Sequence, residues 1–143
     1  MVLFSGQRDG SFIFNMRAIG IEKEKNLSIL RADKILLNLS IERSRGYKDR
    51  GFNEDQIYDL LNRYAVHYVV AQTDFWTDIP SMAALQNLLH DSMRFEVVQV
   101  IPVKSNYNTE DYEIVIYHNL GKVAASPEPL SLQMVGIGRT FSN

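Results

Sequence analysis

Residues 53–71 restrict the fold most, because a helix pattern runs directly into a buried-strand pattern. Asn53 is a good N-cap residue, and Gln56 three residues later completes a capping box. Apolar residues then recur at the spacing of one helix face: Ile57, Leu60, Leu61 and Tyr64. The next segment, HYVVA at 67–71, predicts a buried strand. A helix followed at once by a buried strand is typical of α/β proteins.

The amino-terminal half repeats this alternation. VLF at 2–4 predicts a short strand, and 11–19 predicts a helix with Ser11 as its cap and Gly20 as its end. Residues 27–30 predict a second strand, and the apolar segment 35–41 fits either a strand or a helix. Strands that alternate with helices indicate a parallel sheet with helices on both faces.

The carboxyl-terminal half adds a helix and a hairpin. Pro80 suits a first helical turn, and apolar residues follow at helical spacing: Met82, Leu85, Leu88 and Leu89. The strands predicted at 95–103 and 112–118 are joined by a polar turn, as in an antiparallel hairpin. We therefore expect a small Rossmann-like α/β three-layer sandwich, mostly parallel, with an antiparallel C-terminal hairpin edge.

The domain is expected to span residues 1–120. Residues 121–143 are expected to be a C-terminal linker with a possible edge strand at 130–134. A chain of 143 residues is long enough to bury a core. No apolar run approaches the roughly 18 residues of a membrane span, so the chain alone is expected to be soluble. It also lacks a signal-peptide pattern.

Polar residues gather where three predicted strands end. They are Gln7, Arg8 and Asp9 after the first strand, Arg31, Asp33 and Lys34 after the second, and Gln72, Asp74 and Trp76 after the third. Ligands of open α/β sheets bind outside the carboxyl ends of the strands. We therefore predict a ligand-binding edge there. The alternative is structural: Asp9 and Arg8 pair with neighbours, Asp33 caps a helix starting at Lys34, and Trp76 packs.

Several site classes lack support in the sequence. SGQRDG at 5–10 is neither a dinucleotide fingerprint nor a P-loop, because the required glycines and the G-K-[ST] end are absent. There is no cysteine, and the three histidines show no metal-ligand spacing, so we predict no metal site and no catalytic role for the histidines. No cofactor is predicted. The pI of about 5.9 and the lack of a recognised module argue against nucleic-acid binding.

Charge is unevenly distributed along the chain. Residues 1–50 carry a net charge of +4, whereas the whole chain carries −2. Four cations lie close together in this half: Arg43, Arg45, Lys48 and Arg50. They are candidates for binding lipid phosphates, and the alternative is an ordinary solvated loop.

Three segments together carry a family resemblance. They are VLFSGQRDGSFIFNMR at 2–17, SILRADKILL at 28–37, and the helix that enters YAVHYVVAQ at 64–72. The set resembles the C-terminal soluble region of bacterial polytopic membrane glycosyltransferases of the dolichyl-phosphate-mannose-protein mannosyltransferase-like kind. The ending LQMVGIGRT at 132–140 is similar to the closing segment of those regions. The resemblance covers roughly residues 2–140.

The resemblance implies an accessory domain on the extracytoplasmic face of a bacterial membrane. The catalytic acids of that family lie in the membrane part, so no catalytic residue carries over to this chain. The implied partners are the membrane portion of the parent protein and an anionic lipid or polyprenyl-phosphate sugar. Two alternatives stay open: a free-standing small α/β enzyme or nucleotide-binding protein that uses Asp9, Asp33 and Asp74, and an interaction module that docks through Trp76 and the hairpin edge.

Overall fold

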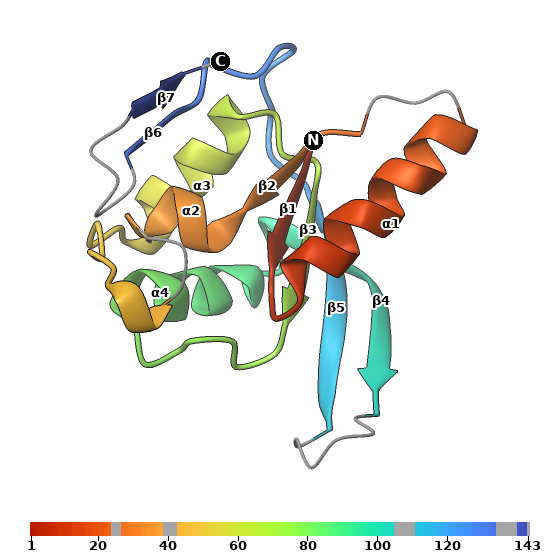
Figure 1. Ribbon diagram of the computed structural model, residues 1–143, viewed down its shortest axis with the longest axis horizontal. Helices are drawn as coiled ribbons and strands as arrows, with labels where there is room; N and C mark the ends of the chain where they lie inside the picture. The colour runs from red at the N-terminus through yellow and green to blue at the C-terminus, as the bar shows by residue number, and fades with distance from the viewer. Residues whose placement is uncertain (24–26, 39–42, 105–110, 134–139, 143) are drawn as a thin grey trace.

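The computed structural model describes residues 1–23, 27–38, 43–104, 111–133 and 140–142. Within these residues one mixed sheet has the strand order β2-β1-β3-β5-β4 (Figure 1). Its strands are β1 (Val2–Ser5), β2 (Ile29–Arg31), β3 (Tyr68–Gln72), β4 (Phe95–Val103) and β5 (Tyr112–Asn119). β1 pairs in parallel with β2 and β3, whereas β5 pairs antiparallel with β3 and β4. The predicted α/β class and the C-terminal hairpin are confirmed.

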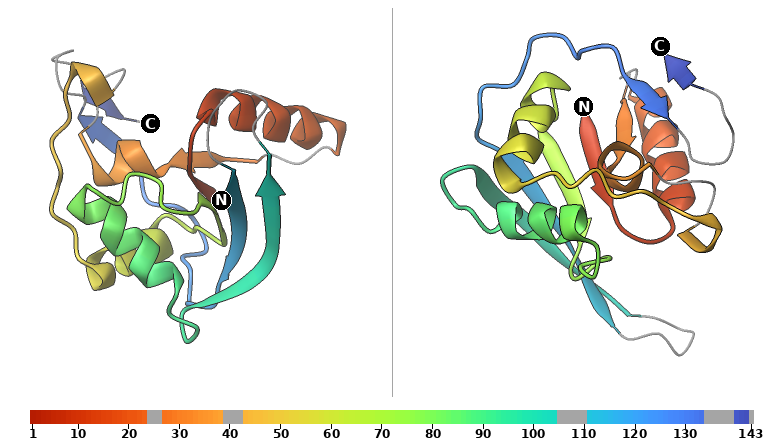
Figure 2. Two further views of the ribbon diagram at one scale, coloured as in Figure 1. Left: turned by 90° about the horizontal axis from the view of Figure 1, so that it is seen from below. Right: turned by 90° about the vertical axis from the view of Figure 1, so that its left-hand side faces the viewer.

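Helices cover the two faces of the sheet unequally. They are α1 (Asp9–Glu22), α2 (Ala32–Leu36), α3 (Glu54–Arg63) and α4 (Pro80–Leu89), with a 3-10 turn η1 (Arg43–Arg45). Figures 1 and 2 show α1 on one side of the sheet and the other three helices on the opposite side. Leu3 of β1 belongs to the core beneath those three helices, whereas the next residue, Phe4, stacks on Phe12 of α1 with ring centroids 4.2 Å apart.

The core forms on the face covered by α2, α3 and α4. α3 has the predicted capping box and buries the predicted residues Ile57, Leu60 and Leu61. α4 begins at Pro80, as predicted, and its predicted apolar face is buried. These helices form as their sequence patterns indicate because their caps and their apolar stripes agree with each other.

The boundaries of α1 and α2 differ from the predicted ones. α1 begins two residues before Ser11, because Arg8 adopts a left-handed conformation and its carbonyl accepts from the amides of Ser11 and Phe12. Gly20 does not end α1; it is the buried residue within it. The ambiguous segment forms α2 and then turns extended at Leu37, which bridges to Asp49. Residues 39–41 of that segment lie outside the described residues.

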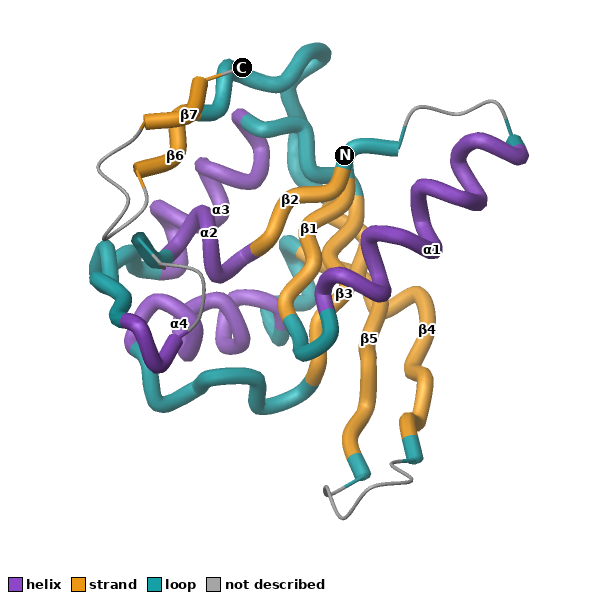
Figure 3. The backbone as a smooth tube through the Cα atoms, in the orientation of Figure 1, coloured by secondary structure: helices purple, strands orange, loops and turns teal. Residues whose placement is uncertain are grey.

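The C-terminal segment does not extend the sheet. Of the predicted edge strand at 130–134, residues Ser131–Gln133 form β6, which pairs antiparallel with β7 (Thr140–Ser142). Figure 3 shows this small hairpin apart from the five-stranded sheet. Met134, and most of the LQMVGIGRT segment, lie outside the described residues. Leu130, just before β6, packs against the main core.

Candidate functional site

The parallel pairing brings the carboxyl ends of β1, β2 and β3 to one edge of the sheet. Phe4 of β1 lies opposite Arg31 of β2 and Val70 of β3. The chain moves from β1 to β2 on one side and returns to β3 on the other, so the strand order reverses between β1 and β3. This is the position at which open α/β sheets bind ligands. The predicted gathering of the three loops at one edge therefore occurs.

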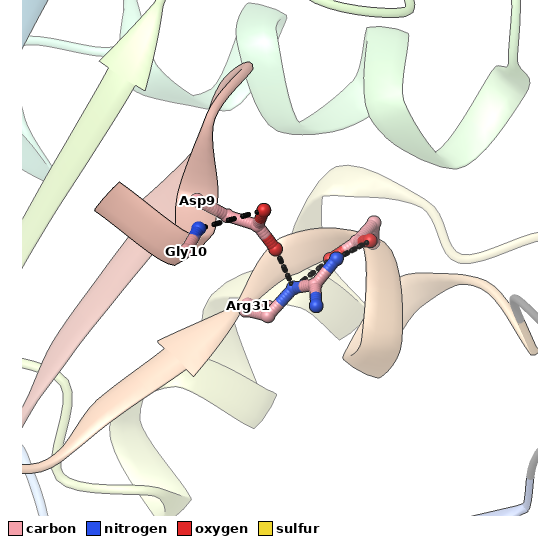
Figure 4. A network of polar contacts seen from close by, with 4 residues as sticks. Asp9, Gly10 and Arg31 are labelled. Carbon is pink, nitrogen blue, oxygen red and sulfur yellow. Dashed lines mark hydrogen bonds and ion pairs between the residues drawn. The ribbon is translucent and has the colours of Figure 1, made fainter. Parts of the chain in front are cut away.

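Arg31 joins two of these loops (Figure 4). Its Nε lies 2.5 Å from Asp9 Oδ2, and its guanidinium donates to Asp33 at 3.1 Å and 2.7 Å. The Asp33 side chain is only 10% exposed, so Arg31 neutralises a carboxylate that would be costly to bury alone. Asp33 lies in the first turn of α2 and does not cap that helix. Burial lowers the pKa of the neighbouring Lys34, and the charge of Asp33 opposes that shift.

Gln72 connects the end of β3 to the loop after β1. Its side-chain oxygen accepts from the Gln7 amide at 3.0 Å, and its carbonyl accepts from the Gln86 side chain of α4 at 3.0 Å. Gly6 lies against it so closely that an added Cβ would be 3.1 Å from Gln72 Cβ. Arg8, one residue past this contact, is exposed. Gln72 is thus a positioning residue, and Arg8 is the accessible cation of the corner.

The loop after β3 presents Asp74 to solvent and holds Trp76 inward. Asp74 is exposed, whereas Trp76 packs against the core. The Trp76 ring stacks on Phe75 with centroids 4.6 Å apart, and the Arg43 guanidinium lies 5.3 Å from its centroid. Trp76 therefore has a packing role, in contact with Phe75 and Arg43. The structure does not bring it into the Asp9–Arg31–Asp33 network.

The four basic candidates do not form one free cluster. Arg43 makes a bidentate ion pair with Asp78, and the Arg50 Nε donates to Asn38 at 2.9 Å. Lys48 is exposed, and the Arg45 side chain lies outside the described residues. Two of the four cations, Arg43 and Arg50, therefore take part in contacts within the protein.

The hydrogen bonds that connect the loop containing Asp49 to α4 were not predicted from the sequence. Asp49 accepts from the Ser81 hydroxyl and, at 3.2 Å, from the Ser81 amide in the first turn of α4. Burial alone would raise the pKa of Asp49, but hydrogen bonds from Ser81, Gly51 and Arg50 outweigh it and lower the pKa. Asp49 thus acts as a cap supplied from 32 residues away. No local pattern around Asp49 signals that role, because a capping box needs neighbours in sequence.

Backbone strain concentrates at the same edge. Among the described residues, four non-glycine residues have positive φ, and three of them follow β1 or β3: Arg8, Asp74 and Trp76. Their φ values of 55–56° lie in the left-handed region that side chains with a Cβ rarely adopt. Such strain persists where surrounding contacts hold it and is frequent at binding sites.

The three predicted aspartates of this edge do not form a pair of free acids. Asp9 and Asp33 are both engaged by Arg31, and Asp74 stands on a separate exposed loop. In the described part of the chain no three acids or histidines are grouped so as to hold a metal ion. None of the helices described has the length and apolar character needed to cross a bilayer. Comparisons with protein-family models, with curated proteins and with solved structures found no match to this chain.

Proposed function

We propose that this chain is a non-catalytic accessory domain of a membrane-bound glycosyltransferase that uses polyprenyl-phosphate sugars. One observation carries the proposal: Arg31 binds both Asp9 and Asp33. These three residues come from two of the segments that carry the family resemblance, residues 2–17 and residues 28–37. The network supports a shared structural role for the two segments, since neither carboxylate is free to act as a general acid or base.

The same proposal covers the finer features of the fold and location. The arrangement β2-β1-β3, with its reversal between β1 and β3, supports a Rossmann-like description of this half of the sheet. We propose that the carboxyl edge contacts the acceptor or the sugar-phosphate head of the donor through Arg8 and Asp74. The domain would stand on the extracytoplasmic face of a bacterial membrane, beside the membrane portion of its parent protein.

A titration followed by NMR tests this function. We expect a short-chain mannosyl phosphate lipid to shift the amide signals of Gln7, Arg8 and Asp74, while free mannose does not. Asp74→Asn should reduce the shifts, whereas Asp59→Asn, which changes another exposed aspartate, on α3, should not. No sugar should be released. Sugar release that is lost in Asp9→Asn would instead establish the free-standing enzyme, and unmoved amides would remove the proposed contact.

A second candidate, an interaction module, is favoured by the hairpin. β4 is an edge strand of the described sheet, and its side chains at Val97, Val98 and Val100 are 55%, 55% and 46% exposed. Edge strands with exposed apolar side chains pair readily with other chains. Val100→Lys should then abolish pull-down of the parent's membrane portion, while Met93→Lys, an exposed change outside β4, should not. Equal pull-down by both variants would remove this candidate.

A further inference from the structure

A hollow of about 850 Å³ lies at the opposite edge of the sheet, where β1 and β2 begin. We call it the amino-edge hollow. Its wall combines the second half of α1, the start of β2, the end of α3 and the segment before β6. Its apolar lining includes Met1, Ile21, Leu27, Ile29, Pro129 and Leu130. In Figure 1, α1 runs away from β1 and β2 toward its carboxyl end.

The wall is held in place on both sides. The Glu128 amide donates to the Arg63 carbonyl at 3.2 Å, and the two side chains pair at 3.5 Å. This attaches the proline-flanked segment 127–129 to the end of α3. On the other side, the Phe4–Phe12 stack anchors the first half of α1 to the sheet. The hollow is therefore bounded by attached elements, as ligand sites generally are.

Among the described residues, Arg17 is the one side-chain cation of this lining, and the ammonium of Met1 donates to the Ala65 carbonyl at 3.1 Å. Arg17 lies one helical turn before Ile21, and within the described part of the chain its guanidinium has no acidic partner. The acid of the lining, Glu128, is already engaged by Arg63. Arg17 thus provides a charge that an anion would complement, directly beside an apolar surface.

We propose that the amino-edge hollow binds a single-chain amphiphile with an anionic head, such as an alkyl phosphate or carboxylate. The alkyl chain lies against the apolar lining, and the head pairs with Arg17. A sugar would bury hydroxyl groups against apolar side chains that offer them no hydrogen-bond partners. A nucleotide would present several phosphate charges to one arginine. The ligand of this site is therefore an amphiphile and is separate from anything bound at the carboxyl edge.

Calorimetry with decyl phosphate, kept below its micelle concentration, tests the site. We expect the whole chain to bind decyl phosphate at least tenfold more tightly than butyl phosphate, since the short chain covers little of the lining. Arg17→Gln should weaken decyl phosphate binding about tenfold and leave decanol binding unchanged. The matched control is Lys104→Gln, which removes an exposed cation just after β4, outside the lining of the hollow, and should change neither.

Two further measurements make the outcome decisive. Leu130→Glu, with its fold checked by circular dichroism, should abolish binding of both decyl phosphate and decanol. A chain extended before Met1 replaces the terminal ammonium with a peptide bond and should bind as before. No binding of decyl phosphate, or equal binding by Arg17→Gln, would overturn the site. So would a chain that sediments with anionic vesicles but ignores monomeric decyl phosphate. Each of these failures would leave the carboxyl-edge titration of the proposed function unaffected.

Discussion

Helices α3 and α1 lie on opposite faces of one sheet and are held in different ways. α3 begins with a reciprocal capping box and buries Ile57, Leu60 and Leu61. α1 has no side-chain cap and buries one residue, while Phe14 and Ile21 are 72% and 81% exposed. The comparison teaches that a helix can be apolar and still contribute little to the core when its apolar residues are spread around its axis. α3 supplies stability, whereas α1 supplies surface.

The largest expected effect is on the α3 side. Leu61→Ala deletes a side chain that is 1% exposed and lies in the core. It should lower the free energy of unfolding by about 3 kcal/mol, because it leaves a cavity that the neighbours fill only in part. Urea denaturation measures this change. A loss below about 1 kcal/mol would break the comparison, since it would mean that the core face is not tightly packed.

The next effect lies at the start of α1, where Arg31 joins the two faces. Arg31→Met should lower the free energy of unfolding by about 2 kcal/mol, because Asp33 keeps its burial and loses its charged donor. Adding Asp33→Asn to that variant should recover part of the loss, since the amide carries no charge. Thermal unfolding of both variants measures this difference in stability. If the double variant recovers no stability, the Asp33 carboxylate is not destabilising when Arg31 is absent.

Asp49 gives a pH-dependent test on the α4 side. Its pKa is lowered in the folded state, so the stability that it contributes is present above the ordinary value of 3.8 and is lost as the pH falls below it. Asp49→Ala should cost about 1.5 kcal/mol at pH 7, from the lost hydrogen bonds to Ser81 and Gly51. Denaturation at pH 7 and at pH 3 should show that the difference in free energy of unfolding between Asp49→Ala and the unmodified chain is smaller at pH 3. The same difference at both pH values would contradict a lowered pKa of Asp49 in the folded state.

The α3 cap should have a smaller effect. Asn53→Ala removes the side chain that accepts from the Gln56 amide at 2.9 Å. A loss of about 1 kcal/mol is expected in chemical denaturation, typical of an N-cap. Ser11→Ala in α1 is the matched control, because Ser11 does not cap its helix, and it should have no measurable effect. Equal losses in the two variants would erase the difference in capping between the helices.

The smallest effect is expected on the outer surface of α1. Phe14→Ala should change the free energy of unfolding by less than about 0.5 kcal/mol, because the ring is already mostly in water. Urea denaturation beside Leu61→Ala makes the contrast direct. A loss comparable to that of Leu61→Ala would show that α1 is a core helix after all.

Much of the α3 side of the fold could be predicted from the sequence. The capping box, the apolar period of α3 and the proline at the start of α4 are all local signals, and each occurs where predicted. β4 spans the predicted residues 95–103, and β5 extends one residue beyond 112–118. α1 was harder to delimit because Arg8 turns the chain by a left-handed residue that its sequence does not signal.

The candidate site divides in the same way. Strand order placed the polar loops after β1, β2 and β3 at one edge, and this followed from the alternation of strands and helices. The alternation of strands and helices could not predict which charged residues form ion pairs. The ion pair of Asp9 with Arg31 joins residues 22 positions apart, and that of Arg43 with Asp78 joins residues 35 apart. Both depend on where whole loops come to rest, which no local pattern encodes.

By itself, the sequence determined the α/β class, the main helices and strands of the core, and the edge at which polar residues meet. Periodicity and capping depend on residues that are close in sequence, so they can be recognised from the sequence alone. Only the tertiary structure decided that Arg31 pairs with both Asp9 and Asp33, that Trp76 packs against the core, and that a hollow opens beside Arg17. These features arise from the packing of distant segments, where the burial of a charge or a ring is settled by its neighbours in space.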